Sequence, residues 1–444
     1  MVSVTKVLFI VGVCVVAVAC GGSSDDTPHP AGAVQWSETV TVGDGSSISG
    51  PLLAAVSPDG TATLLWNRYT GPGGVYAPVA ARSQGMAAWS VPLELETAPA
   101  TLQSFVLALT QAAGQPVAVW VKQEVQSPAV IRAAHFGTAW GAPQSLSTNS
   151  LGGPGDFTGS ANGEAFGVWT EYDGARYAVA SAKRDRAGLW TRTPDMATTN
   201  ATIGPEPVIA TNATGDAVAL WVEGAPGRIH AARLAAGQTA WSPSVMIDSG
   251  DAYSSGPRIV SIGNGVFAAA WDQTLDQQLS LHATYFDGQS WFPPVPLDIG
   301  NGNGAGGARL ASNGQGKAMA VWTRIEGGSA SFWSAAFDGS GWRAPLQVIG
   351  PTNLGIRAGP TLAIDASGRP LVAWTLSGGT NQAVEYTALD DRSNQWTQAV
   401  RLSTGDVEPT SPALAVNRDG QAVIAWVGID GAARSVRARI GQRP

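Results

Sequence analysis

The chain has 444 residues, with 26 Lys and Arg against 33 Asp and Glu and a formal charge of -7. This acidic balance excludes the basic surface that nucleic-acid binding needs. Only 13% of residues are charged, while glycine (55) and tryptophan (17) are abundant, which favours a turn-rich all-β protein over a helical one.

The start of the chain forms a separate segment that contains both cysteines. An apolar run at 7–19 is too short to span a bilayer comfortably and suits the core of a signal peptide. The AVAC at 17–20 resembles the signal box of bacterial lipoproteins, in which the cysteine is lipidated and becomes the new N-terminus. An ordinary cleaved signal or an uncleaved anchor is the alternative. We expect a signal peptide over 1–19, a lipid on Cys20 and a flexible tether over 20–32.

From residue 61 onward, short apolar segments that end in tryptophan recur along the chain. TATLLW (61–66), PVAVW (116–120) and AVIAW (422–426) are examples. Successive tryptophans are 49 to 54 residues apart, which indicates a structural repeat of about 51 residues. This first row consists of Trp66, Trp120, Trp169, Trp221, Trp271, Trp322, Trp374 and Trp426.

A second row of tryptophans follows the first at intervals of 20 to 23 residues, and each member opens another strand. AVQWSETVTV (33–42) matches these segments, so Trp36 is the eighth member, displaced to the other end of the chain. The other members are Trp89, Trp140, Trp190, Trp241, Trp291, Trp342 and Trp396. We interpret both rows as core residues that fill wedges between neighbouring repeats.

Each repeat predicts four strands, called A to D here. Strand A alternates, as in PTLAID (360–365), and a turn with Asp or Asn near Gly leads to strand B with the first-row tryptophan. Strand C is a segment such as RIHAARL (228–234), and strand D carries the second-row tryptophan. Eight such repeats predict one all-β domain over 33–444, an eight-bladed β-propeller of four-stranded antiparallel blades.

The eighth repeat has no D strand of its own. SVRARIGQRP (435–444) aligns with strand C of the other repeats, and the second-row tryptophan that should come next is missing. We expect the segment at about 33–43 to supply this D strand. The ring would then close by pairing the N-terminal strand with the C-terminal strands, which leaves no free closing edge.

The turn before the second-row tryptophan resembles the Asp-box of the sialidase-like (BNR) repeat proteins. FDGQSW (286–291) and FDGSGW (337–342) match it best, while other repeats lack the Asp. The resemblance implies a propeller fold. The catalytic part of the family does not carry over, because no Arg-Ile-Pro signature occurs and no tyrosine with a glutamate partner can be assigned as a nucleophile. Active sialidases also have six blades, whereas eight are predicted here.

A weaker resemblance links the chain to quinoprotein-type propellers, which also have eight blades and recurrent tryptophans. In TALDDRSNQW (387–396), Ala388 and Asp390 fit the motif of that group, but Trp396 comes two residues early and the Thr-Gly is missing. One branch of the group is an outer-membrane lipoprotein of the barrel-assembly machinery. This resemblance therefore implies a scaffold in outer-membrane assembly.

No motif in the sequence predicts catalysis, a metal or a cofactor. GNGAGG (302–307) matches a phosphate-binding pattern but has no helix after it. His135, His230 and His282 fall on C strands of separate blades, which argues against a histidine metal site. We therefore predict no catalytic residue, no metal and no cofactor.

Polar side chains concentrate near the B–C connections, which share one loop-rich face with the D–A connections around the predicted channel. Such side chains could bind sugar hydroxyls or a protein, and a solvated rim is the alternative. The candidate ligand-binding residues are Glu171, Tyr172, Arg176, Glu223, Arg228, Asp272, Arg324 and Glu326.

Together these features predict a monomeric lipoprotein of the bacterial cell envelope, held on the outer membrane by its N-terminal lipid and without a nucleic-acid partner. We expect a non-catalytic binding protein that recognises a glycan or an envelope protein on its loop-rich face. A carbohydrate-active hydrolase or lyase that uses carboxylates on that face is the first alternative. A scaffold in outer-membrane assembly is the second.

Overall fold

Contacts along the chain divide it into two units, Met1–Ala31 and Gly32–Pro444, and the strands all belong to the second. The expected signal peptide, Cys20 and nearly all of the tether belong to the first unit and lie outside the described residues. Within the described part of the chain, no helix is long and apolar enough to cross a bilayer. The computed structural model describes residues 34–44, 48–71, 75–86, 88–96, 102–124, 127–147, 151–204, 206–248, 252–298, 304–352, 355–377, 382–390, 392–403, 407–430 and 433–443.

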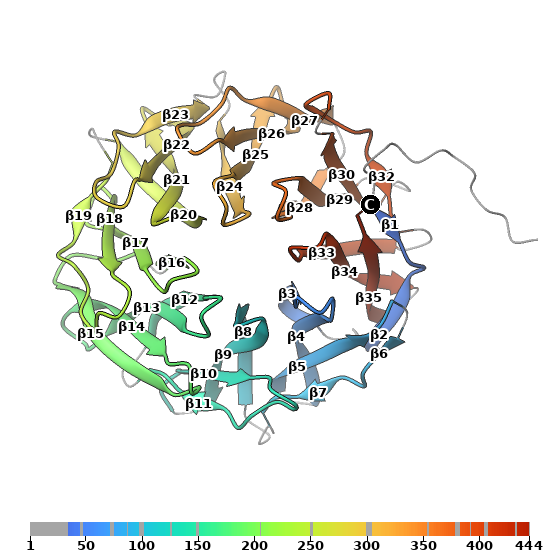
Figure 1. Ribbon diagram of the computed structural model, residues 1–444, viewed down its shortest axis with the longest axis horizontal. Coiled ribbons are helices and arrows are strands. Elements are labelled where there is room, and N and C mark those ends of the chain that lie inside the picture. Colours follow the sequence, from blue (N-terminus) through green and yellow to red (C-terminus); the bar gives the residue numbers. More distant parts are fainter. Residues whose placement is uncertain are drawn as a thin grey trace, which may run out of the picture. The chain divides into compact units, whose positions relative to one another are not determined.

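Eight antiparallel sheets surround a central channel, which confirms the predicted eight-bladed propeller (Figure 1). Each sheet runs from strand A at the channel to strand D at the outer wall. Blade 1 contains β3 (Ile48–Val56), β4 (Ala62–Gly71), β5 (Val75–Gln84), β6 (Ala88–Trp89) and β7 (Leu93–Glu94). Blade 2 contains β8 (Leu102–Ala112), β9 (Gln115–Glu124), β10 (Val130–His135) and β11 (Gln144–Ser145). Blade 3 contains β12 (Leu151–Gly159), β13 (Ala165–Tyr172), β14 (Tyr177–Arg184) and β15 (Trp190–Thr199). Blade 4 contains β16 (Val208–Thr211), β17 (Ala217–Glu223), β18 (Arg228–Leu234) and β19 (Val245–Met246).

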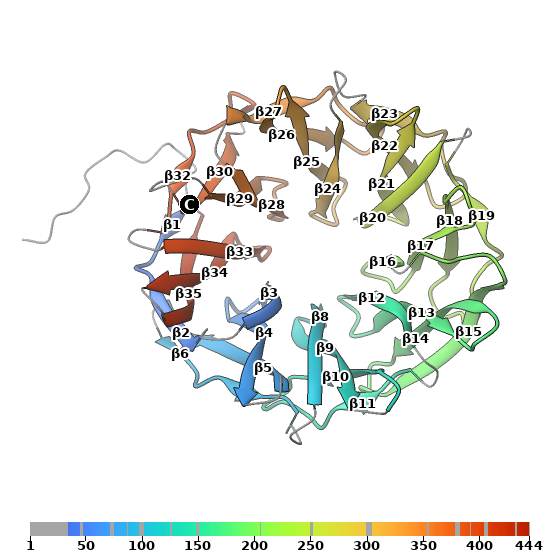
Figure 2. The same cartoon turned by 180° about the vertical axis from the view of Figure 1, so that it is seen from behind.

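The second half of the ring repeats this plan, as the view from behind shows (Figure 2). Blade 5 contains β20 (Tyr253–Gly263), β21 (Val266–Leu275), β22 (Gln278–Phe286) and β23 (Val295–Asp298). Blade 6 contains β24 (Ala305–Ser312), β25 (Ala318–Glu326), β26 (Ser329–Phe337) and β27 (Leu346–Thr352). Blade 7 contains β28 (Gly355–Ile364), β29 (Pro370–Ser377), β30 (Ala383–Asp390), β31 (Gln395–Trp396) and β32 (Val400–Arg401). Blade 8 contains β33 (Val407–Val416), β34 (Gln421–Asp430), β35 (Ala433–Gln442), β1 (Gln35–Trp36) and β2 (Val40–Asp44).

The ring closes where the N-terminal strands join blade 8, as predicted. β1 and β2 both pair antiparallel with β35, so that Trp36 lies opposite Gly441. Glycine is needed at position 441, because a Cβ there would lie 2.4 Å from Val34 Cγ1. The Trp36 ring also packs edge-on against Tyr386 of blade 7, with centroids 5.5 Å apart. The N-terminal segment therefore completes one blade and covers the next.

Buried tryptophans join each blade to the one before it. All eight first-row rings are at most 1% exposed, and each packs among apolar side chains of the preceding blade. The second-row rings lie in the same wedges but nearer the outer wall, where they are only partly buried. The second row is less buried than the first because strand D lies at the outer edge of each blade.

Deleting residues 33–40 should abolish cooperative unfolding, since it removes β1 and the start of β2 from the last blade. Thermal unfolding followed by circular dichroism would measure this. Deleting the polar run 21–32 serves as the control and should leave the transition unchanged. A sharp transition at the normal temperature after the first deletion would show that ring closure does not depend on β1.

Candidate functional site

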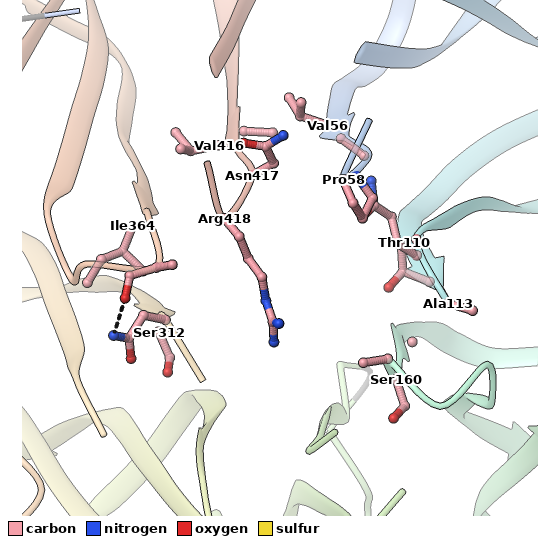
Figure 3. A pocket seen from close by; sticks show the side chains of 18 of the residues that line it. Val56, Pro58, Thr110, Ala113, Ser160, Ser312, Ile364, Val416, Asn417 and Arg418 are labelled. Atoms are coloured by element: carbon pink, nitrogen blue, oxygen red, sulfur yellow. Dashed lines mark hydrogen bonds between the residues drawn. The ribbon is translucent and has the colours of Figure 1, made fainter. Parts of the chain in front are cut away.

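The eight A strands form the wall of the central channel. At the end where the A–B turns lie, the channel widens into a cavity of about 680 Å³. Arg418 extends into this cavity from the A–B turn of blade 8 (Figure 3), and it is the single charged side chain among the described residues that line it. We call this end of the channel the turn end, and the opposite end the loop end.

Polar side chains around the turn end connect neighbouring blades. Asn417 donates to the Ser57 carbonyl at 3.0 Å and joins blade 8 to blade 1. Asn313 donates to the Ala366 carbonyl at 3.0 Å, and Ser160 to the Asn212 carbonyl at 2.7 Å. These side chains hold the ring together, and their hydrogen bonds leave the cavity itself with a mostly apolar wall.

Towards the loop end, one position of the A strands carries charge in three blades. In each blade it is the A-strand residue that pairs with the B-strand residue immediately before the first-row tryptophan. Most A strands have a register shift just before this position, and such bulges re-aim side chains. In blade order the residues are Leu53, Ala108, Asp156, Val208, Arg258, Arg309, Thr361 and Ala413. We call Asp156, Arg258, Arg309 and their charged neighbours Glu206 and Asp272 the charged wall.

Asp156 links the A strands of blades 3 and 4. Its Oδ2 accepts a hydrogen bond from the Ile209 backbone N–H at 3.0 Å, and its Oδ1 accepts one from the Phe157 N–H at 2.9 Å. Burial raises the pKa of Asp156, although these two donors and the Arg258 guanidinium oppose the rise. The residue before it must be glycine, because a Cβ on Gly155 would lie 1.8 Å from the Val168 carbonyl oxygen.

Asp272 makes the equivalent link between blades 5 and 6. Its two carboxylate oxygens lie 3.0 and 3.1 Å from the Gly307 backbone nitrogen, which donates to them. A Cβ on Gly306 would approach its Oδ1 to 2.9 Å, so glycine is needed for this close contact. Burial raises the pKa of Asp272, and the positive charges of Arg258 and Arg309 oppose the rise.

The two arginines of the charged wall lie on the A strands of adjacent blades. Burial lowers the pKa of Arg309, and the like charge of Arg258 lowers it further, while Glu206 and Asp272 raise it. Arg258 also donates to the neighbouring Pro257 carbonyl at 2.7 Å. Guanidinium groups are suited to bind anionic groups, and here the two lie among the carboxylates of Asp156, Glu206 and Asp272.

The predicted rim residues of blade 3 serve different purposes. Glu171 is 1% exposed and accepts hydrogen bonds from the Trp169 indole at 2.7 Å and from Arg192 at 2.6 Å. Tyr172 is exposed, and its hydroxyl donates to the Gly174 carbonyl at 2.9 Å. Arg176 is exposed on the β13–β14 connection. Of these three, Glu171 is part of the wedge and not of the rim.

The remaining candidates divide in the same way. Glu223 accepts a hydrogen bond from the Trp221 indole at 3.1 Å, and Arg228 donates to the Ala252 carbonyl at 3.3 Å. Arg324 binds the buried Asp298 at 2.7 Å and lies 3.4 Å from Glu326. Of all eight candidates, Asp272 alone belongs to the charged wall.

Four residues of the charged wall were not among the sites predicted from sequence: Asp156, Glu206, Arg258 and Arg309. Three of them share a repeat position, because Asp156, Arg258 and Arg309 each lie thirteen residues before the first-row tryptophan of their blade. Charge at this repeat position departs from the apolar or small residues of the other blades. Among the described residues, no group of three or more His, Cys, Asp or Glu side chains is arranged to hold a metal ion.

No family model matches the chain, and a search of curated proteins gives no significant match. Solved structures resemble it only distantly. An α-L-arabinanase of Penicillium chrysogenum is 12% identical with a TM-score of 0.41, over 91% of this chain and 98% of that protein. The NanB sialidase of Streptococcus pneumoniae is 10% identical with a TM-score of 0.39, over 91% and 70%. A prolyl endopeptidase is 11% identical with a TM-score of 0.46, over 85% and 52%. At these scores the likenesses assign neither a family nor an activity.

Replacing Glu171 by Gln should lower the free energy of unfolding by about 2 kcal/mol, because it removes the charge beside Arg192. Urea unfolding would measure the change. Glu326→Gln is the control, because Glu326 is the more exposed partner of its ion pair with Arg324. It should lower the free energy of unfolding by less than about 0.5 kcal/mol. Equal effects of the two substitutions would contradict the assignment of Glu171 to the core.

Asp272→Asn should stabilise the fold at neutral pH and have little effect in acid. The raised pKa means that ionisation of Asp272 favours the unfolded chain, so the wild type loses stability as the pH rises through that pKa. The variant has no such loss, and its amide oxygen still accepts from Gly307. Urea unfolding at about pH 4 and about pH 7.5 would test this. A stability difference that shrinks as the pH rises would contradict it.

Proposed function

We propose that this chain is a non-catalytic binding protein of the bacterial cell envelope, anchored by a lipid on Cys20, whose channel binds an acidic glycan. The observation that carries the proposal is the pair of arginines, Arg258 and Arg309, on the A strands of adjacent blades. The position they occupy is apolar or small in five of the eight blades. Charge at this position is therefore not needed for the fold.

The chemistry of the charged wall suits a sugar that carries a carboxylate. A guanidinium presents several N–H donors in one plane and binds a carboxylate through two parallel hydrogen bonds. Glu206 is exposed and lies within electrostatic reach of Arg309. Its oxygens can accept hydrogen bonds from sugar hydroxyls, which gives the site one group for each part of such a ligand.

The contacts of the two buried carboxylates favour binding over catalysis. Both oxygens of Asp156 and of Asp272 already accept hydrogen bonds from backbone N–H groups. A general acid must present its proton to the substrate, and these oxygens already accept from backbone N–H groups of their own or a neighbouring strand.

One observation favours a carbohydrate hydrolase as the second candidate. Burial raises the pKa of both Asp156 and Asp272, and a raised carboxyl pKa is what a general acid requires in glycoside hydrolysis. Hydrolysis of an acidic oligosaccharide that is lost in Asp272→Asn would establish this function in place of simple binding.

Arg258→Ala and Arg309→Ala should each weaken binding of uronate-bearing oligosaccharides by about tenfold or more, since each removes a charge-assisted contact. Titration calorimetry with the full chain in detergent would measure the dissociation constants. There are two controls. One is the neutral oligosaccharides of the same linkage, and the other is Arg186→Ala, which replaces an exposed arginine on the β14–β15 turn. Unchanged affinity in both channel variants, or equal affinity for neutral and acidic sugars, would contradict the proposal.

A further inference from the structure

The outer wall has a groove where blades 4 and 5 meet. An apolar cavity of about 640 Å³ lies between strand D of blade 4 and the β22–β23 connection of blade 5. A second, polar cavity of about 470 Å³ adjoins it and shares Arg233 and Gln289 with it. The two cavities adjoin at these residues, one with an apolar lining and the other with a polar one. We call the pair the seam groove.

The equivalent seam is filled at two other blade boundaries. Between blades 1 and 2, the Arg82 guanidinium covers the Phe136 ring at 3.7 Å. Between blades 5 and 6, Tyr285 stacks on Phe292 with centroids 4.1 Å apart and also contacts Phe337 at 5.1 Å. Arg82, Arg233 and Tyr285 occupy equivalent positions, because each pairs with the residue three before a first-row tryptophan.

The groove is open between blades 4 and 5 because Arg233 is held aside. Its guanidinium binds Asp216 at 2.9 Å and donates to the Gly288 carbonyl at 3.1 Å. Its guanidinium carbon lies 5.7 Å from the centroid of the Phe286 ring, whereas that of Arg82 lies only 3.7 Å from the centroid of the Phe136 ring. The position that Phe292 fills in the next blade is occupied here by the small Ser242.

Two aromatic rings form the apolar half of the seam groove. Phe286 and Trp291 lie 5.5 Å apart and are tilted by 47° to each other. Val245 and Met246 border them and are 49% and 57% exposed. Apolar D-strand residues are exposed in other blades too, so it is the combination of this border with the two aromatic rings and the cavity that suits a ligand.

The polar half offers hydrogen bonds without net charge from its ion pair. Asp287 accepts from the backbone N–H groups of Gln289 and Ser290, which fixes the turn that presents the Gln289 amide beside Trp291. Arg233 and Asp216 neutralise each other. Asp287 also lines the polar half and adds a negative charge there. The groove therefore combines aromatic faces with amide, backbone and carboxylate groups, and this charge disfavours an anionic ligand.

We propose that the seam groove is a second ligand site, distinct from the channel, which binds a neutral oligosaccharide. A sugar ring has an apolar C–H face that packs on an aromatic ring and a hydroxyl edge that hydrogen-bonds to amides and carbonyls. Such a ligand matches both halves of the groove. An apolar peptide would fill the apolar half but could engage the polar half only through its backbone groups.

Ser242→Phe tests the proposal, because it introduces the residue that fills the equivalent space in blade 5. Screening the full chain in detergent against neutral gluco-, manno-, galacto- and chito-oligosaccharides should identify a ligand that shifts tryptophan fluorescence. The substitution should weaken its binding by about tenfold or more. Ser90→Phe, at the equivalent position of blade 1, is the matched control and should leave the affinity unchanged. Both serines accept a hydrogen bond from the backbone of the facing C strand.

Gln289→Ala removes one polar contact without filling the groove, and it should also weaken binding while the thermal transition remains unchanged. If no neutral oligosaccharide binds, or if Ser242→Phe and Ser90→Phe bind it equally well, the proposal is wrong. Binding of an apolar peptide that Ser242→Phe blocks would also overturn it. Binding of acidic glycans in the channel should be unaffected by Ser242→Phe, so the two sites can fail separately.

Discussion

A tryptophan ring buried between each pair of blades is the interaction on which the whole ring depends. Because each first-row ring belongs to one blade and packs on the blade before it, no blade can bury its apolar face alone. Removing such a ring would cost roughly 3–5 kcal/mol, a large part of the stability of a domain. Trp66 makes this contact with blade 8, so it is fully covered only when the N-terminal strands have joined β35. Closing the ring therefore completes the core around Trp66.

Several of the buried indoles add a second constraint, because their N–H groups are paired with acceptors. Several blades supply a carboxylate: the Trp120 indole donates to Glu96 at 2.7 Å, and the Trp322 indole to Asp298 at 2.6 Å. These carboxylates in turn attract Lys122 or Arg324. Many charged side chains near the B–C connections therefore belong to the wedges. This is why a list of polar residues beside the loops, drawn from sequence, includes core groups such as Glu171.

The fold could be predicted from sequence because it is periodic and the same pattern of strands recurs in each repeat. Two rows of tryptophan at fixed spacing identify the strands, and Trp36 shows where the ring closes. The charged wall could not be predicted in the same way, because its residues come from separate blades and no local motif contains them. Whether Arg258 faces the channel depends on the bulge in β20, which the sequence does not reveal. Glu206 is harder still, since it precedes a strand and has no repeat position.

Both proposed sites lie where the repeat is broken. In a ring of near-identical blades, a residue that every blade shares is explained by packing, while a departure that the fold does not need has another cause. Arg258 and Arg309 replace apolar or small residues of other blades at the channel. Arg233 binds Asp216 and so leaves open a seam that its counterparts Arg82 and Tyr285 help to fill in two other places. The two departures differ in chemistry, since one adds two guanidinium groups beside three carboxylates and the other pairs an arginine with Asp216 beside aromatic rings. A single propeller can thereby present two surfaces that select different ligands.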